Sequence, residues 1–194
     1  LNAVMKWAIG DDMITVNPVT ASKKISTRTD GYRTWSDADI TAYRRRWPEG
    51  TAQRLAMELL LFTGMRRSDV VRIGWPDVRD GAIHYTTQKS QHMTALEIPI
   101  HPILMRHLGG CPKDAETFLR TEQGAPRSEK AMTNWLREAA HAAGLPKDSS
   151  PHGLRKAACR TLAEAGCSAH MIQSITGHKH LAEVETYTKA VNQR

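Results

Sequence analysis

Two short runs of alternating apolar and polar residues interrupt a chain that is otherwise patterned for helices. Residues 82–87, Ala-Ile-His-Tyr-Thr-Thr, and residues 95–100, Ala-Leu-Glu-Ile-Pro-Ile, predict two β-strands. The polar segment Gln88-Lys89-Ser90-Gln91-His92 lies between them and predicts the turn of a hairpin. One hairpin among many helices indicates a fold that is mainly α with a small antiparallel β-sheet, in the α+β class.

Helical periodicity and end signals divide the rest of the chain. Ser36-Asp37-Ala38-Asp39 resembles a capping box in which Asp replaces the usual Glu. Gly64 is a natural stop for the following helix, and Ser68 can cap a short helix after it. An apolar stripe from Ala131 to Ala142 indicates a buried helix face. The predicted helices cover residues 36–46, 51–63, 69–74, 102–108, 128–143, 153–165, 169–175 and 180–190.

The first 34 residues differ in character from the remainder. Residues 1–16 predict the end of a helix and its exit, which Asn17-Pro18 stops because proline disfavours helix at the residue before it. Residues 19–34 are rich in Thr, Ser, Lys and Arg without periodicity, so they predict a basic linker. Residues 35–194 are enough for one domain with a sizeable core. The linker's cations either lie along a phosphate backbone or belong to a solvated tether; they are Lys23, Lys24, Arg28 and Arg33.

The charge balance favours a polyanionic partner. The chain has 27 Lys and Arg against 20 Asp and Glu, a net charge of +7. Such an excess favours nucleic-acid binding through counterion release, and a solvated basic surface is the alternative. No apolar run approaches the roughly 20 residues that cross a bilayer, and no signal peptide is visible. The chain begins with Leu1, as a fragment of a longer protein would.

The cysteines give no sign of a metal centre or a disulfide framework. Cys111, Cys159 and Cys167 are odd in number and widely spaced, and the sequence has no C-x-x-C pair. They predict core thiols in a reducing compartment. A Walker loop and a paired-carboxylate metal cluster are also missing from the sequence, which is consistent with chemistry that uses neither ATP nor a metal.

One arginine stands where a helix gives way to a turn. Arg66 follows the stop at Thr63-Gly64, and its planar guanidinium can bind two phosphate oxygens at once. Asp69, three residues later, could brace that guanidinium; a plain surface ion pair between the two is the alternative. Arg67 is expected to face solvent.

A second group of polar residues occupies the last third of the chain. His152 and Arg155 are three residues apart at a helix start, so their side chains share one face beside an N-terminus that favours anions. His178, in Gly177-His178, precedes the final helix, and Tyr187 follows nine residues later. A tyrosine becomes a nucleophile when a base takes its proton. Taken singly, a His-x-x-Arg pair is usually structural, and a tyrosine is more often a core residue.

The order of these motifs resembles that of the tyrosine recombinase or phage-type integrase family. The resemblance depends on Thr-Gly-Met-Arg, a lysine in a hairpin turn, His-x-x-Arg, Gly-His, and a tyrosine nine residues after that histidine. It runs from about Ser36 to Tyr187. It also implies that residues 1–18 are the last helix of a separate DNA-clamping domain, and that residues 35–194 are the catalytic domain.

The resemblance implies a role for each motif residue. Tyr187 would attack the scissile phosphate and form a 3′-phosphotyrosyl link with a free 5′-hydroxyl. Arg66 and Arg155 would hold the non-bridging oxygens, and His178 would add a donor there. Lys89 would protonate the leaving 5′-oxygen, and His152 would assist proton transfer at the tyrosine. Asp69 would support the site without reacting. Further DNA contacts are expected from Lys23, Lys24, Arg28, Arg67 and Lys156.

The family also implies how the protein would work. It would recombine double-stranded DNA at specific sites without cofactor or metal, as a monomer in solution and a homotetramer on DNA, passing through a Holliday junction. Accessory DNA-bending proteins are possible partners, a membrane is not, and the cytoplasm of a bacterial or phage-infected cell is the expected location. The alternatives are a type IB topoisomerase, a catalytically silent DNA-binding module of the same fold, and a basic helical domain with a chance constellation.

Overall fold

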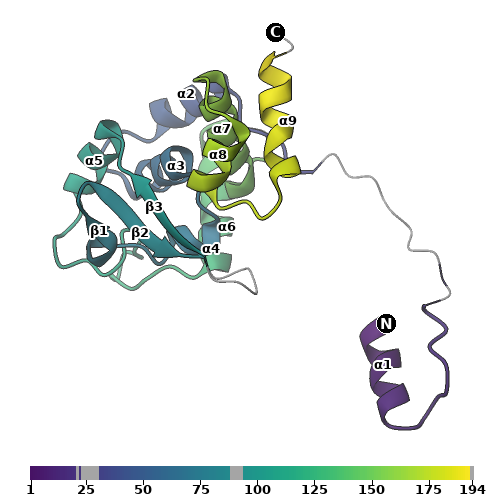
Figure 1. Ribbon diagram of the computed structural model, residues 1–194. Coiled ribbons are helices and arrows are strands. Elements are labelled where there is room, and N and C mark those ends of the chain that lie inside the picture. Colours follow the sequence, from purple (N-terminus) through teal and green to yellow (C-terminus); the bar gives the residue numbers. More distant parts are fainter. Residues whose placement is uncertain (21, 23–30, 88–93, 193–194) are drawn as a thin grey trace. The chain divides into compact units, whose positions relative to one another are not determined.

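The computed structural model describes residues 1–20, 22, 31–87 and 94–192, and the chain divides into two compact units (Figure 1). The first unit comprises Leu1–Gly31 and the second Tyr32–Arg194. The predicted linker cations Lys23, Lys24 and Arg28 and the predicted hairpin turn with Lys89 lie outside the described residues.

The first unit is a short helix followed by a turn. Helix α1 (Asn2–Gly10) ends before the predicted exit at residue 16, and Asp12 adopts a left-handed φ of 55° just after it. The Asn17 amide donates a 2.8 Å hydrogen bond to the Asn2 side chain, so the turn folds back onto the start of the helix. Large apolar side chains such as Trp7 and Val16 are exposed on this unit.

The second unit contains a three-stranded antiparallel sheet, with its strands in the order β1-β2-β3. Strands β2 (Ala82–Thr86) and β3 (Ala95–Pro99) form the predicted hairpin, with Ile83 opposite Ile98. Strand β1 (Val78–Arg79) was not predicted, because two residues are too few to show a period. It turns into β2 through Asp80 and Gly81, both at positive φ.

The helices follow the predicted order, with one shifted segment. The capping box at Ser36 forms, and Gly64 ends its helix in the left-handed conformation. The helix predicted over residues 69–74 was misplaced: it spans Arg67–Val70, Arg66 is its N-cap, and Ser68 lies inside it. A 3₁₀ turn, η1 (Trp75–Asp77), follows. The described helices of the second unit are α2 (Asp37–Arg46), α3 (Ala52–Thr63), α4 (Arg67–Val70), α5 (Pro102–Gly109), α6 (Glu129–Ala142), α7 (Pro151–Glu164), α8 (Ala169–Thr176) and α9 (Leu181–Asn192).

Two apolar clusters hold the second unit together. The main core surrounds α3 and includes the fully buried Trp35, Leu60 and Leu154. A smaller cluster joins α7, α8 and α9. In Figure 1 the sheet and α9 lie on opposite sides of this unit, with α3, α7 and α8 between them. Among the described helices, none is long and apolar enough to span a membrane.

Candidate active site

Arg155 is a buried cation fixed by backbone carbonyls. It lies on the first turns of α7 with 3% of its surface exposed. Its Nη1 donates to the carbonyl oxygens of Gly64, at 2.6 Å, and Thr176, at 2.8 Å. Its Nη2 has no hydrogen-bond partner in the described part of the chain. Burial, and then the charge of Arg66, lowers the pKa of this guanidinium. A buried cation with a spare donor is suited to receive an anion.

Arg66 reaches the same place from the end of α3. The left-handed Gly64 turns the chain, and Arg66 then serves as the N-cap of α4. Its Nη2 donates a 3.1 Å hydrogen bond to the Gly177 carbonyl. The two arginines thereby tie the α3–α4 turn to the α8–α9 turn, although these turns are more than 100 residues apart in sequence. Their positive charges lie close together and repel one another, which is the arrangement that a bound phosphate would stabilise.

His152 occupies the N-terminal turn of α7, as its spacing from Arg155 predicted. Ser150 caps this helix by accepting a hydrogen bond from the Gly153 amide. His152 is exposed, and its ring lies 4.7 Å, centroid to centroid, from the ring of Tyr32. The helix N-terminus adds its own positive potential to this edge of the site.

His178 is partly buried, lines the same cavity as the two arginines, and has a defined tautomer. The Thr176 hydroxyl donates its single proton to the Ile172 carbonyl at 2.7 Å. The 2.6 Å contact between Thr176 Oγ1 and His178 Nδ1 therefore requires Nδ1 to be the donor. Burial, followed by the charges of Arg155 and Arg66, lowers the pKa of His178 to about 3. Near neutral pH the ring is uncharged and leaves Nε2 as an acceptor.

These four residues line one cavity of about 590 Å³. It opens among α4, α6, the start of α7 and the α8–α9 turn. Sequence reasoning had singled out Arg66, Arg67, His152, Arg155 and His178, and all five are there. Its other walls were not predicted; they include Tyr32, Glu129, Thr133, Arg137, Asp148 and Glu183. Arg67 is exposed, as expected, with a 4.0 Å ion pair to Glu129.

Asp69 lies beneath the site but does not brace Arg66, so that expectation was wrong. Only 1% of its surface is exposed, and its Oδ1 accepts a 3.3 Å hydrogen bond from Arg72 instead. Its Oδ2 and the Tyr85 hydroxyl are buried without partners among the described residues. Burial and then the charge of Asp69 raise the pKa of Tyr85 to about 12. Asp69 therefore carries its charge close enough to Tyr85 and Arg155 to shift the pKa of both groups upward.

Tyr187 is held away from the cavity. The cavity's described lining includes Glu183, one turn earlier on α9, but not Tyr187. Tyr187 packs instead against the cluster of Cys159, Ile172 and Val184. Burial raises its pKa to about 12, and the charge of Arg155 partly opposes that shift. The tyrosine is thus near enough to respond to Arg155, and in this position its hydroxyl keeps its proton.

The hairpin ends close to the α8–α9 turn. A Cβ on Gly177 would lie 2.6 Å from Leu96 Cδ1 and 3.5 Å from Thr87 Cγ2, so the two strand ends pack directly on this glycine.

Two cations that were predicted from the sequence to contact DNA form hydrogen bonds within the protein instead. Arg33 binds Asp39, Asp148 and Ser149. Lys156 donates to the Tyr32 carbonyl at 2.7 Å.

The thiols show no metal-binding arrangement in the described part of the chain. Cys159 is buried, whereas Cys111 and Cys167 are partly exposed. Within the described residues, no three His, Cys, Asp or Glu side chains could hold a metal ion.

Comparison with known proteins agrees with this geometry. The phage integrase family profile matches residues 38–194. The integrase of Escherichia phage HK022 is 27% identical over 186 residues, which cover 91% of this chain and 52% of that protein. Tyrosine recombinase XerD of Corynebacterium glutamicum is 26% identical over 149 residues, 73% of this chain and 49% of that protein.

A solved structure has the same fold. A lambda integrase fragment, determined as a dimer bound to a COC′ core site, superposes with a TM-score of 0.76 at 25% identity. The match covers 94% of this chain and 70% of that one. The chain spans about half the length of the curated relatives it matches. With the family profile matching most of its length, the chain belongs to the phage integrase family.

Proposed function

We propose that this chain is the catalytic part of a site-specific DNA recombinase that cuts and rejoins double-stranded DNA through a 3′-phosphotyrosyl intermediate. The observation that carries the proposal is the convergence of Arg66, Arg155, His152 and His178 on one cavity from three separate segments. Two guanidinium groups held this close in a buried site are stabilised by an oxyanion, and the transition state of phosphoryl transfer places charge on such oxygens. The cavity is therefore the place for the scissile phosphate.

The arginines and His178 would bind the phosphate's non-bridging oxygens. Arg155 offers Nη2, and Arg66 has donors left beyond its bond to Gly177. A phosphate beside His178 would raise the pKa of the imidazole, because it offsets the two arginine charges that now depress that pKa. Once protonated, Nε2 would become a donor to the developing oxyanion.

The nucleophile would be Tyr187, brought in by a movement of α9. Its phenolic oxygen would form a bond to phosphorus as the bond from phosphorus to the 5′-oxygen breaks. The phenolic proton would pass to His152, and Lys89 would supply the proton that the leaving 5′-oxygen takes up. For this, Tyr187 has to leave the cluster around Cys159 and replace Glu183 at the cavity.

The family supplies the wider setting of the proposal. We infer that residues 1–18 are the end of a DNA-clamping domain and that residues 19–34 link it to the catalytic domain. The working form would be a monomer in solution and a tetramer on paired DNA sites, with accessory DNA-bending proteins as further partners. The relatives are integrases and a XerD recombinase, which favours strand exchange over topoisomerase activity. We place the reaction at DNA in the cytoplasm of a bacterial or phage-infected cell.

Covalent trapping tests the proposal. The protein is incubated with supercoiled plasmid in EDTA, the reaction is stopped with SDS, and DNA bound covalently to protein is measured. We expect a metal-independent adduct in the wild type and none in Tyr187→Phe. Salt-sensitive DNA binding without any adduct in the wild type would contradict the proposal and identify a silent DNA-binding module instead.

A further inference from the structure

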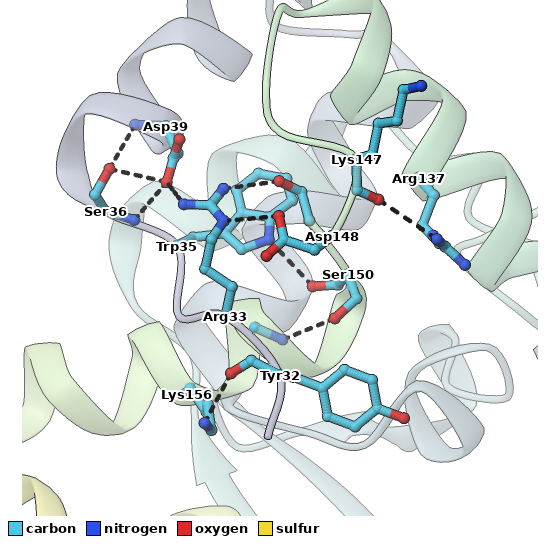
Figure 2. A network of polar contacts seen from close by, with 12 residues as sticks. Tyr32, Arg33, Trp35, Ser36, Asp39, Arg137, Lys147, Asp148, Ser150 and Lys156 are labelled. Carbon is cyan, nitrogen blue, oxygen red and sulfur yellow. Dashed lines mark hydrogen bonds and ion pairs between the residues drawn. The ribbon is translucent and has the colours of Figure 1, made fainter. Parts of the chain in front are cut away.

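The first residues of the second unit form a strap across the start of α7. We define the strap as residues Tyr32–Ser36, which run from the linker to the N-cap of α2. Figure 2 shows its side chains fanning out to several partners, with Tyr32 pointing away from the Arg33 network. The strap precedes its partners on the α6–α7 loop by more than 110 residues in sequence.

Arg33 anchors the strap on two sides. Its Nη1 donates to Asp39 at 2.7 Å, while Nη2 donates to Ser149 at 2.8 Å and Nε to Asp148 at 3.2 Å. The same Asp39 oxygen accepts from the Ser36 amide in the capping box of α2. Hydrogen bonding to Asp39 raises the pKa of Arg33, so the contact favours the charged guanidinium. One arginine thus joins the start of α2 to the loop just before α7 (Figure 2).

Trp35 and Gly153 press the strap onto α7 itself. Trp35 is fully buried, and its indole N–H donates to the Ser150 carbonyl at 3.1 Å. A Cβ on Gly153 would lie only 2.2 Å from the Arg33 carbonyl oxygen and 2.8 Å from Trp35 Cδ1. Only glycine permits so close an approach. Lys156, one turn further on, binds the Tyr32 carbonyl at 2.7 Å.

These contacts fix the backbone that carries Tyr32 and so place its ring at the cavity. The ring lies against the His152 ring at a centroid distance of 4.7 Å and an interplanar angle of 48°. Both residues line the cavity that holds Arg66 and Arg155. Tyr32 is 57% exposed, so its ring contributes little to the core. The hydrogen bonds of Arg33, Trp35 and Lys156 hold the strap in place, whereas a solvated tether would lack such contacts.

We propose that Tyr32 is a positioning residue for His152: the strap holds its ring against the imidazole and thereby aims that imidazole into the cavity. The inference rests on the proposed function, in which His152 takes the proton of the attacking tyrosine. A tilted aromatic contact of this kind restricts the rotation of an exposed histidine. Aim matters because small errors in the position of a proton acceptor slow the reaction steeply. The linker's last residues are then a component of the active site.

The test compares Tyr32→Ala with Tyr32→Phe, which keeps the ring and removes only the hydroxyl. NMR spectra are recorded on the proteins without DNA. The resonance of the His152 ring proton is assigned as the one that is missing from the spectrum of His152→Gln. We expect the ring-current shift of that proton in the wild type and Tyr32→Phe, and its disappearance in Tyr32→Ala. A resonance unaffected by Tyr32→Ala would overturn the inference whether or not the protein cleaves DNA.

The second part of the test measures the rate of covalent adduct formation at saturating DNA. We expect Tyr32→Ala to slow it about tenfold and Tyr32→Phe to restore it, with DNA affinity within about twofold throughout. In a His152→Ala background the Tyr32→Ala change should have no further effect, because the two act as one unit. An equal slowing in both backgrounds would overturn the positioning role. A wild type that forms no adduct but retains the ring-current shift would contradict the proposed function while upholding the Tyr32–His152 contact.

Discussion

Arg155 is buried and Tyr187 is partly buried, and the molecule holds the two side chains in different ways. Arg155 hydrogen-bonds two backbone carbonyls from separate turns, and its neighbour Leu154 belongs to the main core. Tyr187 packs by apolar contact on the small cluster that α7, α8 and α9 share, whose described buried residues are Cys159, Ala163, Ile172 and Val184. Hydrogen bonds from a buried cation are costly to break, whereas a small apolar cluster opens with less free energy. We therefore propose that the half of the site assigned to the phosphate is preformed, whereas the half that carries Tyr187, the proposed nucleophile, can move.

The largest effect is expected from removing the hydroxyl group of Tyr187, the proposed nucleophile. Tyr187→Phe removes the hydroxyl and keeps the apolar ring that packs on Cys159 and Val184. We expect covalent adduct to fall below detection, with DNA affinity and thermal stability unchanged. Tyr43→Phe is the control, since it removes a hydroxyl that binds the Gln53 carbonyl in the main core. Adduct persisting in Tyr187→Phe would assign the nucleophile to another residue.

Arg155→Ala should damage both binding and folding. It leaves the buried carbonyls of Gly64 and Thr176 without their donor, which costs about 2–4 kcal/mol in the free energy of unfolding. Urea unfolding measures this loss, and phosphate-dependent DNA binding should weaken in parallel. The matched control is Arg160→Ala on the same helix, where a partly exposed arginine pairs with Asp37 and less than about 1 kcal/mol is expected. Equal losses in the two variants would show that Arg155 is not specially fixed.

The features that the sequence could predict are those that depend on nearby residues. Local signals were sufficient for the hairpin, for the capping box at Ser36 and for the shared face of His152 and Arg155, because each depends on neighbours a few residues away. The partner of Asp69 was predicted wrongly, since an i,i+3 spacing fits both Arg66 and Arg72 and tertiary packing chose the latter.

The family resemblance brought Arg66, His152, Arg155 and His178 to one site, but two other features that depend on tertiary contacts were missed. Nothing near Tyr32 in the sequence indicates that it meets His152, 120 residues later, because the strap's partners come from the α6–α7 loop and α7. Gly153, a glycine within a helix, is a sign in the sequence that another segment lies close to the backbone there. The resting place of Tyr187 was equally hidden, because the +9 spacing from His178 gives the tyrosine's helix but not the side on which it packs.

A smaller effect is expected from loosening the mobile half. Val184→Ala removes two buried methyl groups from the α9 cluster and should cost about 2 kcal/mol. Because that cluster is separate from the main core, amide hydrogen exchange should quicken in α9 and stay unchanged in α3. Val70→Ala, a fully buried change in the main core, is the contrast and should quicken exchange throughout the unit. Uniform exchange in Val184→Ala would mean that the two halves open together.

The last prediction concerns the proton on His178, which reports whether the cavity between the arginines is empty. The folded pKa of about 3 lies below the ordinary 6.5, so the unfolded chain binds more protons between these values. Stability contributed by the neutral ring is therefore complete above about pH 6.5 and declines as the pH falls toward 3. Urea unfolding across this range should show a steeper decline in the wild type than in His178→Gln, which cannot titrate. Inorganic phosphate should raise the pKa of His178 in NMR titrations, because an anion offsets the charges of Arg66 and Arg155. A His178 that titrates near 6.5 without phosphate would mean that the arginines are not held together before DNA arrives.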